Sequence, residues 1–180
     1  MNYGTLPSRF LSAIDQLPNP RAQMFRHGDR WEAISSAEFL RRVAGLSSAL
    51  VELGVKMGDR VAIFSANRPE WHTADFAITG AGGVSVPIYF NESPQRMVYI
   101  LNHSEARIVF VSGAKQLEKL LACRAELLTV EHIVAADAVP EAAPECLRYE
   151  TLIAGSGATE IASYRLQASQ VQPGQLSSLI

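Results

Sequence analysis

The chain has 180 residues, with 16 Lys and Arg against 18 Asp and Glu and a formal net charge of −2. At this length folding buries roughly 70% of the unfolded chain's surface, so stability requires neither disulfides nor a structural metal. The near-neutral charge excludes the clustered basic surface of a nucleic-acid-binding protein.

Cys123 and Cys146 lack the C-x-x-C spacing of zinc and thioredoxin-type sites, so we expect reduced thiols. No apolar stretch reaches the 18 or so residues of a membrane span, and no signal-peptide pattern follows Met1. These features predict a cytoplasmic, soluble chain.

The N-terminal part alternates helical and extended patterns. Apolar spacing predicts a helix over Thr5–Leu17, and two extended runs around Gly28 predict a β-hairpin over Gln23–Ile34. Ser35-x-x-Glu38 is a capping box, in which each side chain is expected to accept from the other residue's backbone amide. It opens an amphipathic helix that ends near Leu53, where Gly54 suits a left-handed cap.

Short apolar strands then alternate with helices, which predicts βαβ units, a parallel sheet and the α/β class. The strands are expected at Arg60–Phe64, Val84–Tyr89, Arg107–Val111 and His132–Ala135. The helices are expected at Pro69–Ala81, Ser93–Asn102 and Ala114–Leu121. Pro87 cannot donate a ladder hydrogen bond, so it indicates a strand end or a bulge.

The C-terminal part has weaker signals. The two prolines and several acids of residues 136–144 predict a surface loop. A short ordered element is expected at Tyr149–Ala154. Gln172-Pro173-Gly174 is a turn, after which the apolar run Leu176–Ile180 stops inside an element. We therefore expect the chain to be the front of a longer protein.

The usual catalytic patterns are not found. Gly80-Ala81-Gly82-Gly83 lacks the register and lysine of a phosphate loop, which favours a tight turn from helix to strand. Ser156, between two adjacent glycines, does not match a nucleophile elbow, and the four histidines have no ligand spacing. Asp59 with Arg60, and Glu105 with Arg107, are candidate surface ion pairs that indicate no function.

Asn67-Arg68-Pro69-Glu70-Trp71 has two interpretations. It can be a capped helix start, with Glu70 beside the helix dipole and Trp71 packed on the sheet. It can also be a pocket wall, because it follows the carboxyl end of a strand, where open α/β sheets bind ligands.

Five motifs in series resemble the adenylate-forming family, which includes acyl-CoA synthetases, firefly luciferase and peptide-synthetase adenylation domains. They are G-D-R-V-A-I (58–63), N-R-P-E-W (67–71), A-G-G-V-S-V-P-I-Y (81–89), S-P-Q-R-M-V-Y-I-L-N (93–102) and A-R-I-V-F-V (106–111). The N-R-P-E-W and P-I-Y forms are most similar to the long-chain fatty acid CoA ligases.

The resemblance implies the first subdomain of an AMP-forming ligase, which joins a carboxylic acid to coenzyme A with ATP and Mg²⁺ and releases AMP and pyrophosphate. The family's T-S-G-T-T-G-x-P-K-G loop would follow a run like Leu176–Ile180, and the Y-G-x-T-E segment and the catalytic lysine lie further on. The chain contains none of these, so it is expected to be inactive alone and to bind none of the cofactors.

The resemblance carries few site residues onto this sequence. Gly82 matches a glycine near the pantetheine arm of coenzyme A, where a missing side chain allows close approach. Tyr89 and Asn91 match the segment beside the acyl and nucleotide cleft. The arginine that grips the coenzyme A phosphate in acetyl-CoA synthetases has no counterpart at Ile100. No residue is assigned to catalysis or to a metal.

We expect one N-terminal subdomain fragment, composed of a helix and hairpin (1–34), an α/β core (35–135), and a loop with final elements (136–180). The expected partners are a fatty acid or another carboxylic acid through the whole protein, a membrane surface at its periphery, and a second copy through an exposed subdomain face. The alternatives are a non-catalytic nucleotide- or partner-binding module, and a ligase for an aromatic or medium-chain acid.

Overall fold

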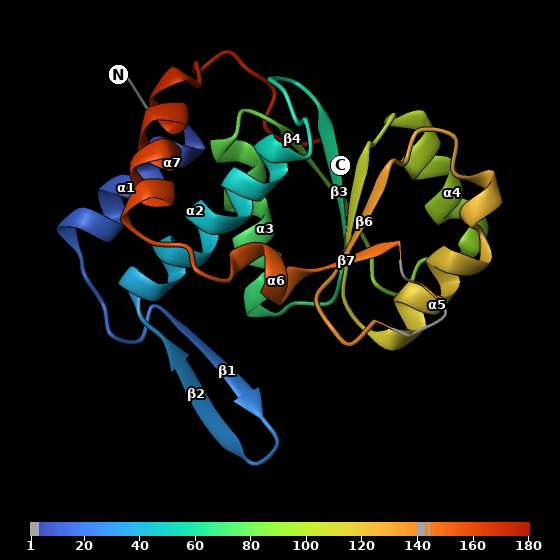
Figure 1. The fold of residues 1–180 in the computed structure, drawn as a ribbon, viewed down its shortest axis with the longest axis horizontal. Helices are drawn as coiled ribbons and strands as arrows, with labels where there is room; N and C mark the ends of the chain where they lie inside the picture. Colours follow the sequence, from blue (N-terminus) through green and yellow to red (C-terminus); the bar gives the residue numbers. More distant parts are fainter. Residues whose placement is uncertain (1–3, 140–142, 144) are drawn as a thin grey trace.

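The computed structural model describes residues 4–139, 143 and 145–180. It has the predicted α/β fold, with a five-stranded parallel sheet and an antiparallel hairpin (Figure 1). The strands are β1 (Gln23–His27), β2 (Arg30–Ile34), β3 (Arg60–Phe64), β4 (Val84–Ile88), β5 (Ile108–Val111), β6 (His132–Ala135) and β7 (Cys146–Arg148). The helices are α1 (Leu6–Gln16), α2 (Ser36–Glu52), α3 (Pro69–Gly80), α4 (Pro94–His103), α5 (Ala114–Ala122), α6 (Tyr149–Ile153) and α7 (Ala158–Gln170), with a short 3₁₀ turn at Arg124–Glu126.

The sheet has the strand order β4-β3-β5-β6-β7, and all neighbouring pairs are parallel. Its central strands are nearly continuous runs of buried residues, as expected for a sheet covered on both faces. Because side chains alternate along a strand, Val61 and Ile63 of β3 face one layer, and Ala62 and Phe64 face the other. Figure 1 shows α1, α2, α3, α6 and α7 on one side of the sheet and α4 and α5 on the other.

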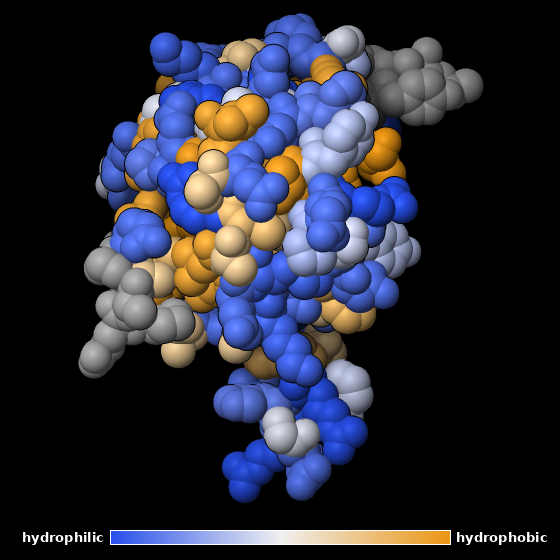
Figure 2. Space-filling view, turned by 90° about the vertical axis from the view of Figure 1, so that its right-hand side faces the viewer, coloured by the Kyte–Doolittle hydropathy of each residue, from blue (hydrophilic) through white to orange (hydrophobic). Residues whose placement is uncertain are grey.

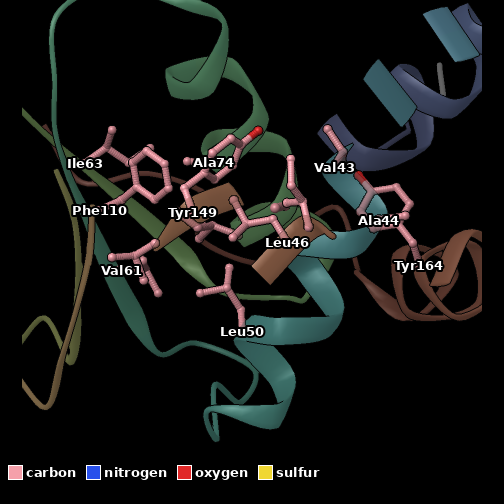
Figure 3. Packing of buried hydrophobic residues seen from close by; sticks show 14 of the residues in the cluster. Val43, Ala44, Leu46, Leu50, Val61, Ile63, Ala74, Phe110, Tyr149 and Tyr164 are labelled. Atoms are coloured by element: carbon pink, nitrogen blue, oxygen red, sulfur yellow. The ribbon is translucent and has the colours of Figure 1, made fainter. Parts of the chain in front are cut away.

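Helix α2 is the centre of the larger layer. Figure 3 shows Leu46 and Leu50 directed toward the sheet, near Val61, and Val43 and Ala44 on the part of the helix near Tyr164. These residues belong to one cluster, and each is at most 3% exposed. Burial of such side chains contributes about 1.5–3 kcal/mol each before the entropy cost of folding. Helix α2 therefore joins the sheet to elements from the C-terminal part of the chain.

The start of α2 differs in one respect from the predicted capping box. The Ser35 hydroxyl accepts from the Glu38 amide, as expected. The Glu38 carboxylate instead accepts from the guanidinium groups of Arg41 and Arg42, at 2.7 Å each. The hydrogen bond from Arg41 lowers the pKa of the Glu38 carboxyl most strongly, and the bond from Arg42 lowers it further. Burial acts in the opposite direction, and the net result is a pKa of about 2. Two ion pairs one turn away thus outcompete the capping amide.

The ion pairs at the amino ends of the strands are exchanged relative to the prediction. Arg60 Nη2 lies 2.6 Å from Glu105 Oε2, and Arg107 Nη1 lies 2.6 Å from Asp59 Oδ2. Strands β3 and β5 start side by side, with Val61 opposite Ile108, so residues across the sheet are closer than sequence neighbours. The prediction that residues close in sequence form these ion pairs was wrong.

The C-terminal tail adds to the free edge of β4. Gln175 closes the predicted turn by donating to the Gln172 carbonyl. Ser85 then donates to the Ser177 carbonyl and accepts from the Leu179 amide, both at 2.9 Å, which makes a parallel bridge. Pro87, two residues after Ser85, has its nitrogen on this same outer edge, where no β3 partner requires a donor. The run 176–180 therefore lies along the β4 edge and makes one isolated bridge there, outside the strands of the sheet.

Besides the short 3₁₀ turn, one strand and one helix were not predicted. Strand β7 extends the sheet beside β6, and α7 packs against α2 and α3. The predicted loop over 136–144 lies partly outside the described residues, at 140–142 and 144, and Ala143 is buried rather than on the surface. Within the described ranges, none of the helices is long and apolar enough to cross a bilayer.

Candidate functional site

The connections of the sheet change direction between β3 and β5. Helix α3, which follows β3, lies on one face of the sheet, and α5, which follows β5, lies on the other. Open α/β sheets bind ligands at this kind of point, outside the carboxyl ends of the strands. Here Ser65 and Ser112 come directly after the two strands, and their buried hydroxyls are 2.5 Å apart. An internal hydrogen bond between these two hydroxyls therefore occupies this point of the sheet.

Arg68 crosses the same edge of the sheet. Its Nε donates to Glu70 at 2.7 Å, and its Nη1 donates to both carboxylate oxygens of Asp137 at 2.8 and 2.9 Å. Asp137 also accepts from the Gly113 amide at 2.5 Å. Burial opposes ionisation of Asp137, but the amide and the guanidinium outweigh it and hold the pKa of this carboxyl below its usual value. Arg68 is thus neutralised by two carboxylates and presents no unpaired charge to an anion.

The Asn67–Trp71 segment combines both predicted interpretations. Pro69 is the first residue of α3 and Glu70 is in its first turn, but Arg68 is the N-cap and makes no side-chain capping bond. Trp71 is partly buried against the larger core cluster. Residues 67–70 of the segment, with His72, also form one wall of an open cleft of about 840 Å³ whose other wall is strand β1 with Ala22.

Tyr89 and Asn91 lie in the loop after β4, at the carboxyl edge. Tyr89 is 76% exposed, and Asn91 is exposed too. The loop is held from α5: Gln116 Nε2 donates to the Phe90 carbonyl at 3.0 Å, and Lys119 Nζ donates to the Glu92 carbonyl. These anchors fix the backbone while leaving the Tyr89 side chain free in solvent.

Gly82 lies at the opposite edge of the sheet. It has a φ of +81°, and its carbonyl accepts from the Gly58 amide at 2.9 Å. A Cβ there would be 2.5 Å from Met57 Sδ, which is a flexible side chain, so the left-handed backbone is the stronger reason for glycine. The five residues of β4, roughly 17 Å of strand, separate Gly82 from Tyr89. The structure therefore places Gly82 apart from Tyr89 and Asn91, which share one loop.

Gly82 instead contributes to a small pocket of about 120 Å³ at the amino edge of the sheet. Its walls come from the start of α1, the end of α3 and the turn before the tail, and include Thr5, Thr79, Gln172 and Ser177. Segments from both ends of the chain thus meet beside Gly82.

The remaining sequence candidates have structural roles. Ser156 donates to the Ile153 carbonyl at 2.8 Å, and a Cβ on Gly45 would collide with the Ser156 side chain, so this serine packs against α2. Cys123 and Cys146 are free and buried. The part of the chain that the structure describes holds no group of three or more His, Cys, Asp or Glu side chains arranged to bind a metal.

The sequence reasoning missed Ser65, Ser112, Asp137 and Gln116. The first two each immediately follow a predicted strand, and Asp137 comes two residues after one. Position at the carboxyl end of parallel strands is the signal that could have identified these three. Gln116 lies on a predicted helix, and only the folded loop shows its contact.

Comparisons with known proteins agree with this architecture. The model of the family described as AMP-binding enzyme matches residues 11–179. The long-chain-fatty-acid–CoA ligase FadD15 of Mycobacterium bovis is 32% identical over 82% of this chain and 22% of its own length. Fatty acyl-CoA synthetase A of Dictyostelium discoideum is 37% identical over 65% of this chain and 17% of its own.

Among solved structures, the anthranilate CoA ligase AuaEII, in complex with anthranoyl-AMP, matches 99% of this chain and 32% of that chain. The TM-score is 0.80 at 23% identity, which shows the shared fold alone. This chain spans about a fifth of the length of the curated relatives that it matches. With a family match over nearly all its residues, on the fold of the adenylate-forming CoA ligases, the chain belongs to the AMP-binding enzyme family.

Proposed function

We propose that these residues are the N-terminal fragment of a fatty acid CoA ligase. Such an enzyme converts ATP, a carboxylic acid and coenzyme A into acyl-CoA, AMP and pyrophosphate. The observation that carries the proposal is the series of relatives named as fatty acid ligases, at 32–37% identity. The N-R-P-E-W and P-I-Y motifs support the long-chain branch.

The fragment alone is proposed to be inactive. Acyl-adenylate formation requires cations and amides to meet the negative charge that spreads around phosphorus. At the carboxyl edge of this sheet Arg68 is already paired with Glu70 and Asp137, and the described residues offer no metal-binding cluster. These residues do not fit a magnesium–triphosphate complex, so we assign no step of the reaction to them. ATP, Mg²⁺ and coenzyme A belong to the whole enzyme.

Within the whole enzyme, Tyr89 and Asn91 are proposed to line the acyl and nucleotide cleft. Their exposure at the carboxyl edge, on a loop anchored by α5, supports this role. Gly82 is proposed to approach the pantetheine arm. Its left-handed backbone and its position in a small pocket at the amino edge are compatible with a close contact there.

The whole enzyme is proposed to work in the cytoplasm and at the periphery of a membrane. The 180 residues are proposed to act as one subdomain, whose exposed apolar face contacts another copy when the fragment is isolated.

The test begins with the purified chain, hexadecanoate, ATP, Mg²⁺ and coenzyme A. We expect no thioester by liquid chromatography, and thioester formation would refute the inactivity of the fragment. Calorimetric titration with ATP at millimolar concentration addresses the nucleotide-binding alternative, and we expect no heat of binding.

The parent activity is tested on the open reading frame downstream of Ile180. We expect a glycine- and threonine-rich loop with a lysine, and an expressed product that activates hexadecanoate in preference to octanoate and benzoate. Preference for benzoate or octanoate would transfer the proposal to the aromatic or medium-chain alternative.

A further inference from the structure

The turn that carries Tyr89 and Asn91 has a fixed backbone. The Glu92 amide donates to the Tyr89 carbonyl at 2.9 Å, which closes residues 89–92 into one turn. The side chains of Tyr89 and Asn91 are both exposed. Exposed connections of this kind are normally among the more mobile parts of a domain. The contacts that hold the turn therefore decide where these two side chains lie.

Two side chains of α5 hold the turn from outside. Gln116 Nε2 donates to the Phe90 carbonyl at 3.0 Å, and Lys119 Nζ donates to the Glu92 carbonyl. The Lys119 ammonium also lies 5.6 Å from the centre of the Phe64 ring, which is a cation–π distance. Phe64 ends β3, the strand between β4 and β5, so the lysine extends past the end of a strand to reach the turn.

These two anchors differ from the neighbouring polar residues of the same helix. Figure 2 views the molecule from the side of α4 and α5, and polar side chains cover most of that face. Lys115 and Glu118 are exposed there, whereas Gln116 and Lys119 are partly buried and direct their polar atoms to backbone carbonyls. Ordering a long polar side chain costs conformational entropy. Helix α5 thus orders two such side chains against one exposed turn.

The start of α4, which follows the turn, has contacts of its own. The Ser93 hydroxyl caps this helix by accepting from the Arg96 amide at 3.3 Å. The Glu92 carboxylate accepts from the Ser93 amide at 3.3 Å and lies 3.5 Å from Arg96 Nε. The bonds from α5 instead end on carbonyls of the turn. Their effect is therefore on the turn and not on the helix after it.

We propose that Gln116 and Lys119 are positioning residues that hold Tyr89 and Asn91 in place for the acid substrate. The inference rests on the proposed function, because that proposal assigns Tyr89 and Asn91 to the acyl and nucleotide cleft. A loop whose backbone is fixed before binding loses less entropy when it meets its ligand. Removal of an anchor should therefore weaken binding of the acid and leave the fold intact.

The first experiment measures the turn in the 180-residue chain. Gln116→Glu keeps the shape of the side chain and removes the donor, and a carboxylate in the first turn of α5 is favourable for the helix. Lys119→Met keeps the length of the side chain and removes the ammonium. Each should speed hydrogen exchange of the Glu92 amide about tenfold, as for the loss of one hydrogen bond. Exchange of the Val84 amide, at the other end of β4, should be unchanged.

Two further variants are matched controls for the lysine. Lys119→Arg keeps a cationic donor and should retain the protection of the Glu92 amide. Lys115→Met removes an exposed lysine of the same helix and should leave exchange unchanged. Circular dichroism checks that every variant is folded. Unaltered exchange at Glu92 in both Gln116→Glu and Lys119→Met would overturn the inference.

The second experiment uses the whole enzyme and the acid that it prefers among hexadecanoate, octanoate and benzoate. Gln116→Glu and Lys119→Met should raise the KM for this acid about tenfold, and Lys119→Arg should restore it. The KM for coenzyme A should be unchanged, because Gly82, the proposed pantetheine contact, lies at the opposite edge of the sheet. A general loss of folded enzyme would lower the apparent kcat and would not separate the two KM values.

The wild type and the variants test different claims. If the wild-type enzyme is active and both anchor variants keep its KM for the acid, this inference is overturned and the ligase proposal stands. If the wild-type enzyme activates none of the three acids, the ligase proposal is overturned and this inference falls with it.

Discussion

At the scale of single residues, two helices approach closely because a glycine leaves room. A Cβ on Gly80 would lie 2.1 Å from the ring of Tyr164, which is 1% exposed and donates to the Phe76 carbonyl at 3.0 Å. The backbone of Gly80 has ordinary helical geometry, so the requirement is for space. The contact joins the end of α3 to α7.

Gly80→Ala is expected to lower the free energy of unfolding by about 1–3 kcal/mol, because the added methyl group overpacks this contact. Urea denaturation measures the change. Gly174→Ala, where a Cβ meets nothing within 4 Å, should stay within about 0.5 kcal/mol of the parent chain.

A double-mutant cycle separates the clash from other effects. On a Tyr164→Ala background the ring is gone, so Gly80→Ala should add no further loss of stability. Equal losses on both backgrounds would show that helix-end geometry, and not Tyr164, makes glycine necessary.

At the scale of elements, the tail completes the outer edge of β4 with few hydrogen bonds. Ser85 uses both its amide and its carbonyl on the tail, through Ser177 and Leu179. Its neighbour Val84 instead donates to the Asp59 carbonyl at 2.8 Å, which does not involve the tail. Amide exchange can therefore distinguish the two bonding partners.

Leu179→Pro is expected to speed hydrogen exchange of the Ser85 amide on the order of tenfold, because it removes the donor that holds the tail in register. Exchange at Val84 should be unchanged. Leu179→Ala keeps the donor and should retain most of the Ser85 protection, as nuclear magnetic resonance can measure. Unaltered exchange at Ser85 in the proline variant would contradict the strand pairing.

The elements that the sequence predicted are those with strong patterns. The β3–α3–β4–α4–β5 series follows from buried apolar runs, prolines at first helical turns and glycines after helices. Helix α7 was missed because only two of its residues, Tyr164 and Ala168, are buried, which leaves a weak apolar stripe. The Gly157 amide, which donates to Glu160 at 2.6 Å, is the one helix-start signal there.

The site residues depended on information that no short pattern contains. Arg68 was placed at the correct edge of the sheet, but its partner Asp137 is distant in sequence, and only the sheet order brings them together. For the same reason, Asp59 pairs with Arg107 and Glu105 with Arg60, which is the reverse of the predicted pairing. Gly82, Tyr89 and Asn91 came from a family resemblance, and their binding roles stay predictions.

At the scale of the whole molecule, an apolar strip follows the β4 edge. Tyr89 and Phe90 are 76% and 45% exposed, and the tail, running parallel to β4 toward them, exposes Leu176 and Leu179. Large apolar side chains left exposed along one edge favour association through that edge. We expect the isolated chain to associate through this strip.

Sedimentation velocity should therefore show concentration-dependent dimers. Tyr89→Ser with Phe90→Ser should weaken the dimer about tenfold or more, because two large apolar side chains leave the interface. Leu128→Ser, at an exposed apolar residue that is not part of this strip, should leave the dimer intact. A monomer at all concentrations would refute the association.

The burial of α2 beneath the last helix has a consequence for synthesis. Val43, Leu46 and Ala44 share a cluster with Tyr164 and Ala168, which a ribosome adds far later. Until α7 leaves the exit tunnel, the nascent chain displays the uncovered apolar side of α2. Ribosomes that stall before Ala158 should thus release aggregation-prone products that recruit chaperones.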